Sequence, residues 1–180
     1  MQKAIEFAVK AHSGQFRKDG KTPYIFHPFD VFSLVRNWGI TDQDIWKACL
    51  CHDILEDCPT VTNDELIQEI GPKAAKICEE LTFIPDKNSE IPVNMQKHEY
   101  MKSFMDKSIE AIIIKCADRI CNTLDFKRES PNYAPSYWSK AFRLFEAHEK
   151  RSYKIQLAYG YQTAHNMNLA IENMDASFRS

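Results

Sequence analysis

The sequence predicts an all-α fold formed by a single domain of 180 residues. Glycine is scarce, at five residues, and the apolar residues of several segments follow helical rather than alternating spacing. One segment, SIEAIIIKCADRICNTLDF at residues 108–126, contains three consecutive isoleucines that could belong to a buried strand. We expect a helix there instead, because the segment is long, lacks glycine and proline, and has no convincing strand to pair with.

The first helix is expected near the N-terminus. Ile5, Val9 and His12 lie along one stripe of it, and Phe7 and Ala8 widen that stripe. A polar stretch follows, SGQFRKDGKTPYIFHP, in which an Asp-Gly turn signal and two prolines indicate a loop. The stripe is therefore predicted to face the core, and the polar stretch is predicted to lie at the surface.

Two further helices are expected before residue 60. Residues 28–38 begin with a proline suited to the first turn, and Gly39 suits the end of that helix. Thr41 or Asp42 can cap a third helix, which we expect to continue without interruption to Pro59.

The rest of the chain alternates helices with loops. Residues 62–65 form a capping box, and a Gly-Pro pair at 71–72 separates that short helix from the next one. We expect loops at 84–93 and 129–138, and C-terminal helices at about 137–176. With no composition shift or repeat along the chain, residues 1–180 are predicted to form one domain, whose motifs lie within about 1–128.

Composition narrows the class of protein. The formal net charge of −2 gives no bulk attraction to nucleic acid or to an anionic membrane. No apolar run approaches the ~20 residues that span a bilayer, and charges interrupt what would be a signal-peptide core. We therefore expect a soluble, cytoplasmic protein whose thiols stay reduced and buried. The six cysteines are Cys49, Cys51, Cys58, Cys78, Cys116 and Cys121.

The segment LCHDILEDCP, at residues 50–59, predicts a functional site. It gathers a histidine and three carboxylates, which a helix core would not bury without a partner or a metal ion. On a helix, His52 and Glu56 share one face, and Asp53 and Asp57 share the adjacent face. The His-Asp pair can supply two ligands to one ion, and the acids one turn later would lie near whatever else the ion binds.

Other ligands must come from elsewhere in the chain. His27 lies at the start of a helix behind a flexible stretch, and Asp118 precedes Asn122 by one helical turn. Together with His52 and Asp53, they would form a shell of two histidines and two carboxylates. That mixture suits Mn²⁺ or Fe²⁺, with Zn²⁺ as a further option, and leaves positions open for water or substrate.

The order of these motifs resembles the HD-domain metal-dependent phosphohydrolases. More narrowly, GQFRKDGKTPYIFHP at 14–28, the segment HDILED, Leu81-Thr82 and ADRICN at 117–122 resemble the hydrolase domain of the RelA/SpoT family and its small stand-alone, Mesh1-type members. The resemblance covers about the first two-thirds of the chain. It implies an HD-domain helical bundle with the metal site between helices, and removal of the 3′-pyrophosphate from guanosine tetra- and pentaphosphate alarmones, commonly with Mn²⁺.

The resemblance also implies a role for each matching residue. The metal ligands would be His27, His52, Asp53 and Asp118. Glu56 and Asp57 match the acidic pair that orients or activates the attacking water. Arg17 and Lys18 match a basic pair that contacts the purine and its phosphates, and Asn122 matches a residue near the ribose and the metal. Lys97 is the remaining predicted substrate contact, because it can meet a phosphate.

Departures from the family pattern leave alternatives open for the substrate. The expected basic pair is replaced by Gln96-Lys97-His98, and Thr123-Leu124-Asp125 follows Asn122 where the long enzymes have an arginine-threonine pattern. Another nucleotide, such as NADPH or a 3′- or 2′-phosphonucleotide, is one alternative, and a non-catalytic nucleotide-binding protein is another. We expect the aromatic residues of the last third to serve the core or a contact between copies of the chain: Tyr133, Tyr137, Trp138, Phe142 and Phe145.

Overall fold

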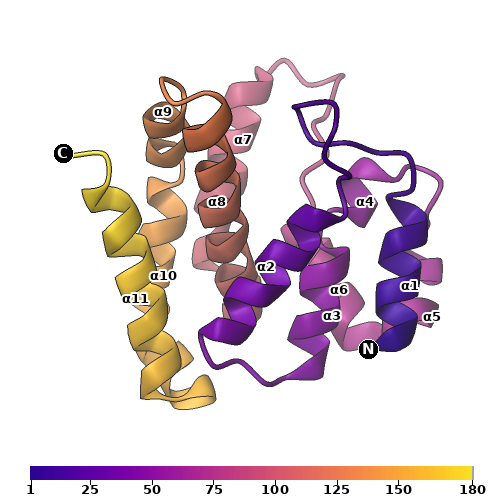
Figure 1. The fold of residues 1–180 in the computed structure, drawn as a ribbon, viewed down its shortest axis with the longest axis horizontal. Helices are drawn as coiled ribbons and strands as arrows, with labels where there is room; N and C mark the ends of the chain where they lie inside the picture. Colours follow the sequence, from indigo (N-terminus) through magenta and orange to yellow (C-terminus); the bar gives the residue numbers. More distant parts are fainter. Residues whose placement is uncertain (180) are drawn as a thin grey trace.

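The computed structural model describes residues 1–179, and these fold into helices joined by loops (Figure 1). The only β-type pairing among them is an isolated bridge between Phe16 and Pro23, so the predicted all-α class is confirmed. The helices are α1 (Gln2–Ala11), α2 (Phe26–Asn37), α3 (Gln43–Cys51), α4 (Ile54–Asp57), α5 (Asn63–Ile70), α6 (Pro72–Leu81), α7 (Val93–Lys102), the short 3₁₀ turn η1 (Ser103–Met105), α8 (Ile109–Glu129), α9 (Ala134–Ser139), α10 (Phe142–Tyr159) and α11 (Tyr161–Ala176).

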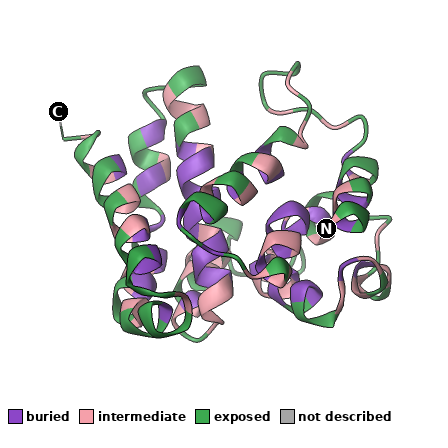
Figure 2. Cartoon of the chain, turned by 60° about the horizontal axis from the view of Figure 1, so that its bottom comes forward, coloured by how far each residue is buried: buried purple, intermediate pink, exposed green. Residues whose placement is uncertain are grey.

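Helix α8 runs through the middle of the bundle, with α10 and α11 on one side and α2, α3 and α6 on the other (Figure 1). Its predicted helical state is confirmed: Ser108 caps its first turn by accepting a hydrogen bond from the amide of Ala111 at 3.1 Å. The three isoleucines at 112–114 are fully buried, and Figure 2 shows buried residues along the helices that face the core. Burial on all sides explains why this segment has the apolar run of a strand.

The predicted buried stripe of the first helix is confirmed for Phe7, Ala8 and His12 and is wrong for Val9. Ala4, Phe7 and Ala8 are buried in α1, whereas Val9 is 46% exposed. The small side chains let α1 approach α3 and α5 closely, and Val9 lies on the outer face. The centre of the buried face is thus set by the two alanines one turn apart, with Phe7 beside them, and not by Val9.

Most of the predicted helix ends are confirmed. Asp42 caps α3 by accepting from the amide of Asp44 at 2.8 Å, and Thr62 caps α5 by accepting from the amide of Glu65 at 3.2 Å. Helix α2 starts at Phe26, two residues earlier than expected, and Gly39 follows its end with a positive φ of 100°. A side chain there would be strained.

The segment at 129–138 is not wholly a loop, because it contains the six-residue helix α9. Trp138 is 5% exposed, and its ring lies 4.4 Å from that of Phe145 on α10. The proline in the first turn of α9 has a suitable backbone angle, so a residue that signals a loop here starts a helix instead. Helices α10 and α11 agree with the expected C-terminal helices.

The six cysteines are free and buried, as expected of thiols that serve as small core residues. In the part of the chain that is described, no helix combines the length and the low polarity required to span a membrane.

Candidate metal centre and active site

Four side chains predicted to bind metal converge at one point. His27 comes from the first turn of α2, His52 and Asp53 from the junction of α3 and α4, and Asp118 from the middle of α8. The Nε2 atom of His27 lies 3.1 Å from Oδ1 of Asp118 and 3.7 Å from Oδ2 of Asp53. The Nε2 atom of His52 lies 3.0 Å from Oδ2 of Asp53 and 3.8 Å from Oδ1 of Asp118. Segments far apart in the sequence thus bring two imidazoles and two carboxylates together.

The continuous helix predicted through this segment is wrong, because α3 ends at Cys51 and α4 begins at Ile54. His52 and Asp53 form the turn between them. One-turn spacing nevertheless persists, since the amide of Asp57 donates to the carbonyl of Asp53 at 2.8 Å. The break turns His52 and Asp53 toward α2 and α8, while Glu56 and Asp57 remain one turn further along.

The chemistry of this donor set fits a divalent cation. The carbonyl of Cys49 can only accept, so the 2.8 Å contact to Nδ1 of His52 makes that nitrogen the donor. In its neutral form the ring would present a lone pair at Nε2, an atom that is buried and has no hydrogen-bond partner in the described chain. A lone pair 3.0 Å from a carboxylate oxygen is repelled unless a proton or a cation lies between them. A cation would relieve this repulsion.

The electrostatic field at His52 points to the same conclusion. Burial alone would lower the pKa of its imidazole, but the neighbouring carboxylates of Asp53 and Asp118 outweigh burial and raise it to about 10. Despite its own burial, Asp118 has a pKa well below the usual value, because Lys115 and the histidines favour its charged form. The centre therefore attracts positive charge strongly.

Three other side chains hold the carboxylates in place. Tyr24 donates its hydroxyl to Oδ2 of Asp53 at 2.7 Å, and Nζ of Lys115 lies 2.8 Å from Oδ2 of Asp118. The side-chain amide of Asn122 donates to the other oxygen of Asp118. Contacts of this kind restrict the orientation of groups that bind metal.

The cluster opens into a cavity of about 720 Å³. Asp53 and Asp118 border it together with the predicted acidic pair, Glu56 and Asp57. The cavity is large enough for a nucleotide, since small-molecule sites commonly measure about 300–1,000 Å³. Two of the four predicted ligands thus share one cavity with the predicted acids, while His27 and His52 do not border it.

The environment of the acidic pair suits proton transfer. Desolvation raises the pKa of Glu56, while Lys115 and a hydrogen bond from the amide of Phe83 partly oppose the shift. Desolvation also raises the pKa of Asp57, and the charge of Asp53 adds to this effect. A carboxylate with a raised pKa accepts a proton more readily than an ordinary one at neutral pH.

The predicted substrate contacts are only partly brought together. Asn122 and Lys97 border the large cavity, with Nζ of Lys97 5.9 Å from the ring centre of Phe83. Lys18 is exposed, borders neither cavity described here, and lies over Phe126, with 4.4 Å between Nζ and the ring centre.

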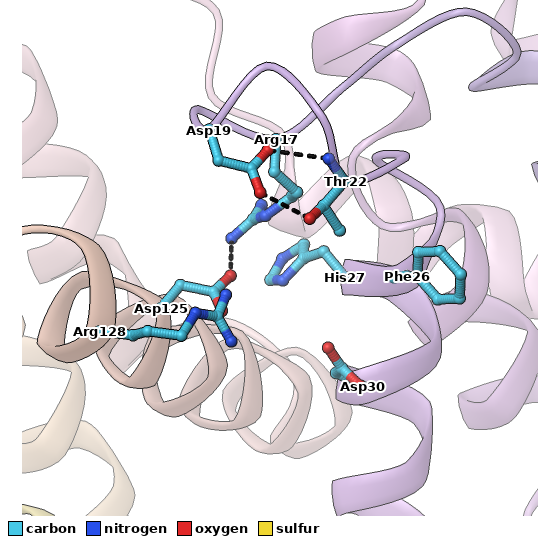
Figure 3. A pocket seen from close by; sticks show the side chains of 8 residues that line it. All are labelled: Arg17, Asp19, Thr22, Phe26, His27, Asp30, Asp125 and Arg128. Carbon is cyan, nitrogen blue, oxygen red and sulfur yellow. Dashed lines mark hydrogen bonds and ion pairs between the residues drawn. The ribbon is translucent and has the colours of Figure 1, made fainter.

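Arg17 is held at the edge of the site by other protein groups. Its guanidinium donates to Oδ1 of Asn122 at 2.8 Å and to Oδ2 of Asp125 at 2.5 Å. Figure 3 shows Arg17 and Asp125 facing each other beside a second, smaller cavity of about 230 Å³ that borders His27. Arg17 is therefore linked to Asp118 through Asn122, and it is preorganised in one orientation.

Sequence reasoning missed one wall of the large cavity. Tyr133, Tyr137 and Phe142 border it, a position that the expectation of a role in the core or in a contact between copies did not include. For Trp138 and Phe145, which pack on each other, the core prediction is confirmed. The sequence contains no indication of α9, because its residues have the composition of a loop. Tyr133, which precedes this helix, and Tyr137, which lies on it, both border the cavity. Cationic groups accompany this wall: Lys115, Arg119 and Lys140.

Comparison with known proteins identifies the family. The HD-domain family model matches residues 4–148. This chain is an HD-domain protein. The metal-ligand cluster described above lies within the matched residues, so the HD domain provides a divalent-metal site whose candidate donors include His27, His52 and Asp53.

Curated relatives place the HD protein more narrowly. It is 38% identical over 130 residues to guanosine-3′,5′-bis(diphosphate) 3′-pyrophosphohydrolase MESH1 of Xenopus tropicalis, covering 71% of this chain and 70% of that one. The MESH1 protein of Homo sapiens is 36% identical over the same length and coverage. The chain therefore belongs to the MESH1 family of HD proteins. A longer relative from Haemophilus influenzae, also called guanosine-3′,5′-bis(diphosphate) 3′-pyrophosphohydrolase, is 33% identical over 117 residues, which are 64% of this chain and 17% of that protein.

A solved structure supports the fold. A metazoan ortholog of SpoT, described as hydrolysing ppGpp, superposes with a TM-score of 0.77 over 98% of this chain and 93% of its own, at 22% identity. The arrangement of helices is thus shared over nearly the whole chain, including the C-terminal helices that lie beyond the HD-domain match.

Proposed function

We propose that this HD protein is a divalent-metal-dependent hydrolase that removes pyrophosphate from the 3′ side of guanosine 3′,5′-bis(diphosphate). The observation that carries the proposal is the convergence of His27, His52, Asp53 and Asp118, two of which border the same nucleotide-sized cavity as the acidic pair. The names of the curated relatives supply the substrate class.

The proposed ion is Mn²⁺, held by the two imidazoles and two carboxylates. A mixed nitrogen and oxygen shell suits Mn²⁺ or Fe²⁺ and also accepts Zn²⁺. When bound, such an ion neutralises charge on phosphoryl oxygens and lowers the pKa of a coordinated water. The low pKa of Asp118 keeps its carboxylate charged, and a bound ion would replace the proton that the raised pKa of His52 favours on its imidazole.

The chain's own residues would then direct the hydrolysis. Glu56 or Asp57 accepts a proton from the attacking water. The oxygen of that water forms a bond to the phosphorus attached to the ribose 3′ oxygen. The bond between that phosphorus and the 3′ oxygen breaks, the 3′ oxygen receives a proton, and GDP and pyrophosphate leave. Lys115 borders the cavity within 2.8 Å of Asp118, where its charge favours the anionic phosphate group.

The remaining predicted contacts would orient the nucleotide. Arg17 presents a planar guanidinium that can stack on a base, and its bonds to Asn122 and Asp125 fix that plane. Asn122 would meet the ribose, Lys97 a phosphate, and Lys18 the outer face of the purine or its phosphates. The aromatic wall of Tyr133, Tyr137 and Phe142 provides a second surface on which a base can stack.

A panel of nucleotides tests this function. Metal-stripped protein is incubated with and without Mn²⁺ against guanosine tetra- and pentaphosphate, NADPH and simple 3′-phosphonucleotides. We expect turnover only with metal, and the highest kcat/KM for the guanosine alarmones. A higher kcat/KM for NADPH or for a phosphonucleotide would keep the metal site and overturn the substrate. No turnover by metal-loaded protein would favour a nucleotide-binding role.

A further inference from the structure

Next to the acidic pair lies a hydrogen-bond network that contains two buried side chains and does not border the large cavity. His12 caps the C-terminal end of α1, Gln15 lies in the turn that follows, and Cys58 ends α4. His12 is 3% exposed and Cys58 is 4% exposed. The network therefore joins α1 to the short helix that carries Glu56 and Asp57.

The hydrogen bonds of Gln15 can be satisfied in only one orientation of its amide. Its Nε2 lies 2.9 Å from the carbonyl oxygen of Asp57 and 3.6 Å from Sγ of Cys58. A flipped amide would place two acceptors against each other at the Asp57 carbonyl. The Oε1 atom must therefore face Nδ1 of His12, at 2.7 Å.

This orientation fixes the tautomer of His12. Because Oε1 of Gln15 accepts, Nδ1 of His12 must carry the hydrogen. In the neutral ring, Nε2 then carries a lone pair and no hydrogen. This atom is buried and has no hydrogen-bond partner in the part of the chain described. Burial also lowers the pKa of His12, which favours the neutral ring.

The imidazole of His12 also contacts a residue that binds one of the proposed metal ligands. Its ring packs against that of Tyr24, with 4.9 Å between centroids, and Tyr24 donates to Asp53. His12 thus contacts two groups that lead to opposite halves of the site. Gln15 leads to the backbone at Asp57, and Tyr24 leads to a proposed metal ligand.

We propose that His12 and Gln15 are positioning residues that hold the C-terminal end of α4 through the carbonyl of Asp57. They would keep the Glu56–Asp57 pair at a fixed place relative to the metal ligands. Helix α4 has only four residues, and its C-terminal carbonyl at Asp57 receives the hydrogen bond from Gln15 instead of one from within the helix. This inference rests on the role proposed above for Glu56 and Asp57.

Two variants of Gln15 separate the halves of the network. Gln15→Leu removes both hydrogen bonds. Gln15→Glu keeps an acceptor for His12 but cannot donate to the carbonyl of Asp57. The matched control is Gln2→Leu, which removes an exposed bond between Gln2 and Glu6 on the outer part of α1. The readouts are kcat, KM, Mn²⁺ affinity and the ring ¹⁵N shifts of His12.

Both Gln15 variants are expected to lower kcat by about 10–100-fold, the loss that follows small misplacement of a catalytic group. KM and Mn²⁺ affinity should stay within about twofold of wild type, because the metal ligands themselves are untouched. The ¹⁵N shifts should report the Nδ1–H tautomer of His12 in wild type and in Gln15→Glu, and lose that preference in Gln15→Leu. Gln2→Leu should match wild type in every readout.

Unchanged kcat in both variants would overturn the positioning role. So would a loss of Mn²⁺ affinity that parallels kcat, since the effect would then act through the metal ligands. If Gln15→Leu does not fold, the near-isosteric Gln15→Glu protein decides the kinetic result. Wild-type protein that fails to hydrolyse the alarmone would refute the proposed function alone, whereas an Nε2–H tautomer of His12 in that same protein would refute the network.

Discussion

The Asp118→Asn protein is expected to lose divalent metal and, with it, all measurable turnover. Loss of a residue that only orients a ligand typically weakens metal affinity about 10–100-fold, and loss of a ligand carboxylate should cost more. The substitution also removes the partner of Lys115, whose Nζ lies 2.8 Å from the Asp118 carboxylate. Removing one partner of a buried ion pair costs about 3–5 kcal/mol of stability, because the remaining charge is unpaired. Isothermal titration with Mn²⁺ and thermal unfolding measure the two effects.

A double variant separates the two losses. In Asp118→Asn with Lys115→Met, no unpaired ammonium remains, so stability should recover while Mn²⁺ affinity does not. Asp44→Asn is the matched control, because Asp44 pairs with Lys47 at the surface, 3.2 Å away, and lies outside the site. Recovery of Mn²⁺ binding in the double variant would show that Asp118 stabilises the fold rather than the ion.

The Glu56→Gln, Asp57→Asn protein is expected to keep its metal and lose turnover by about 10²–10⁴-fold, the usual contribution of a general base. Glutamine and asparagine preserve shape while removing the proton acceptor. Mn²⁺ affinity should remain close to wild type, since the acids lie one turn beyond the proposed ligands. Single-turnover kinetics with the alarmone, beside a Mn²⁺ titration, provide the test.

The pH dependence of the wild-type protein is a second test of the role proposed for Glu56 and Asp57. Desolvation raises the pKa of both Glu56 and Asp57, so the protonated, inactive forms persist to a higher pH than for an ordinary carboxyl group. The value of kcat/KM should therefore fall as pH decreases through these raised pKa values. The residual kcat/KM of the Glu56→Gln, Asp57→Asn protein should not fall in this way at low pH. Wild-type turnover in the double variant would leave a different group as the base.

The position of the metal centre could be predicted from sequence because the order of its motifs resembles that of a known family. His52 and Asp53 are adjacent, whereas His27 and Asp118 lie in separate segments that only the resemblance joins to this pair. The break between α3 and α4 could not be predicted, since no glycine or proline interrupts that segment. It follows from tertiary packing, in which Ile54 is fully buried while the preceding pair faces α2 and α8.

The substrate wall was harder to predict for a different physical reason. Tyr133 and Tyr137 reach the cavity only because α9 packs against α8, and the proline-containing segment gives no periodic signal of its own. Lys115 was also missed, because a lysine three residues before an aspartate on a helix ordinarily forms a surface pair. Its side chain is only 12% exposed, a fact that depends on the helices around α8.

Product analysis on guanosine 3′,5′-bis(diphosphate) tests the central claim most directly. Metal-stripped protein is given the nucleotide with and without Mn²⁺, and the products are identified by ³¹P NMR. We predict GDP and pyrophosphate in equal amounts, formed only when metal is present. Orthophosphate in place of pyrophosphate, or the same products without any divalent ion, would contradict the account.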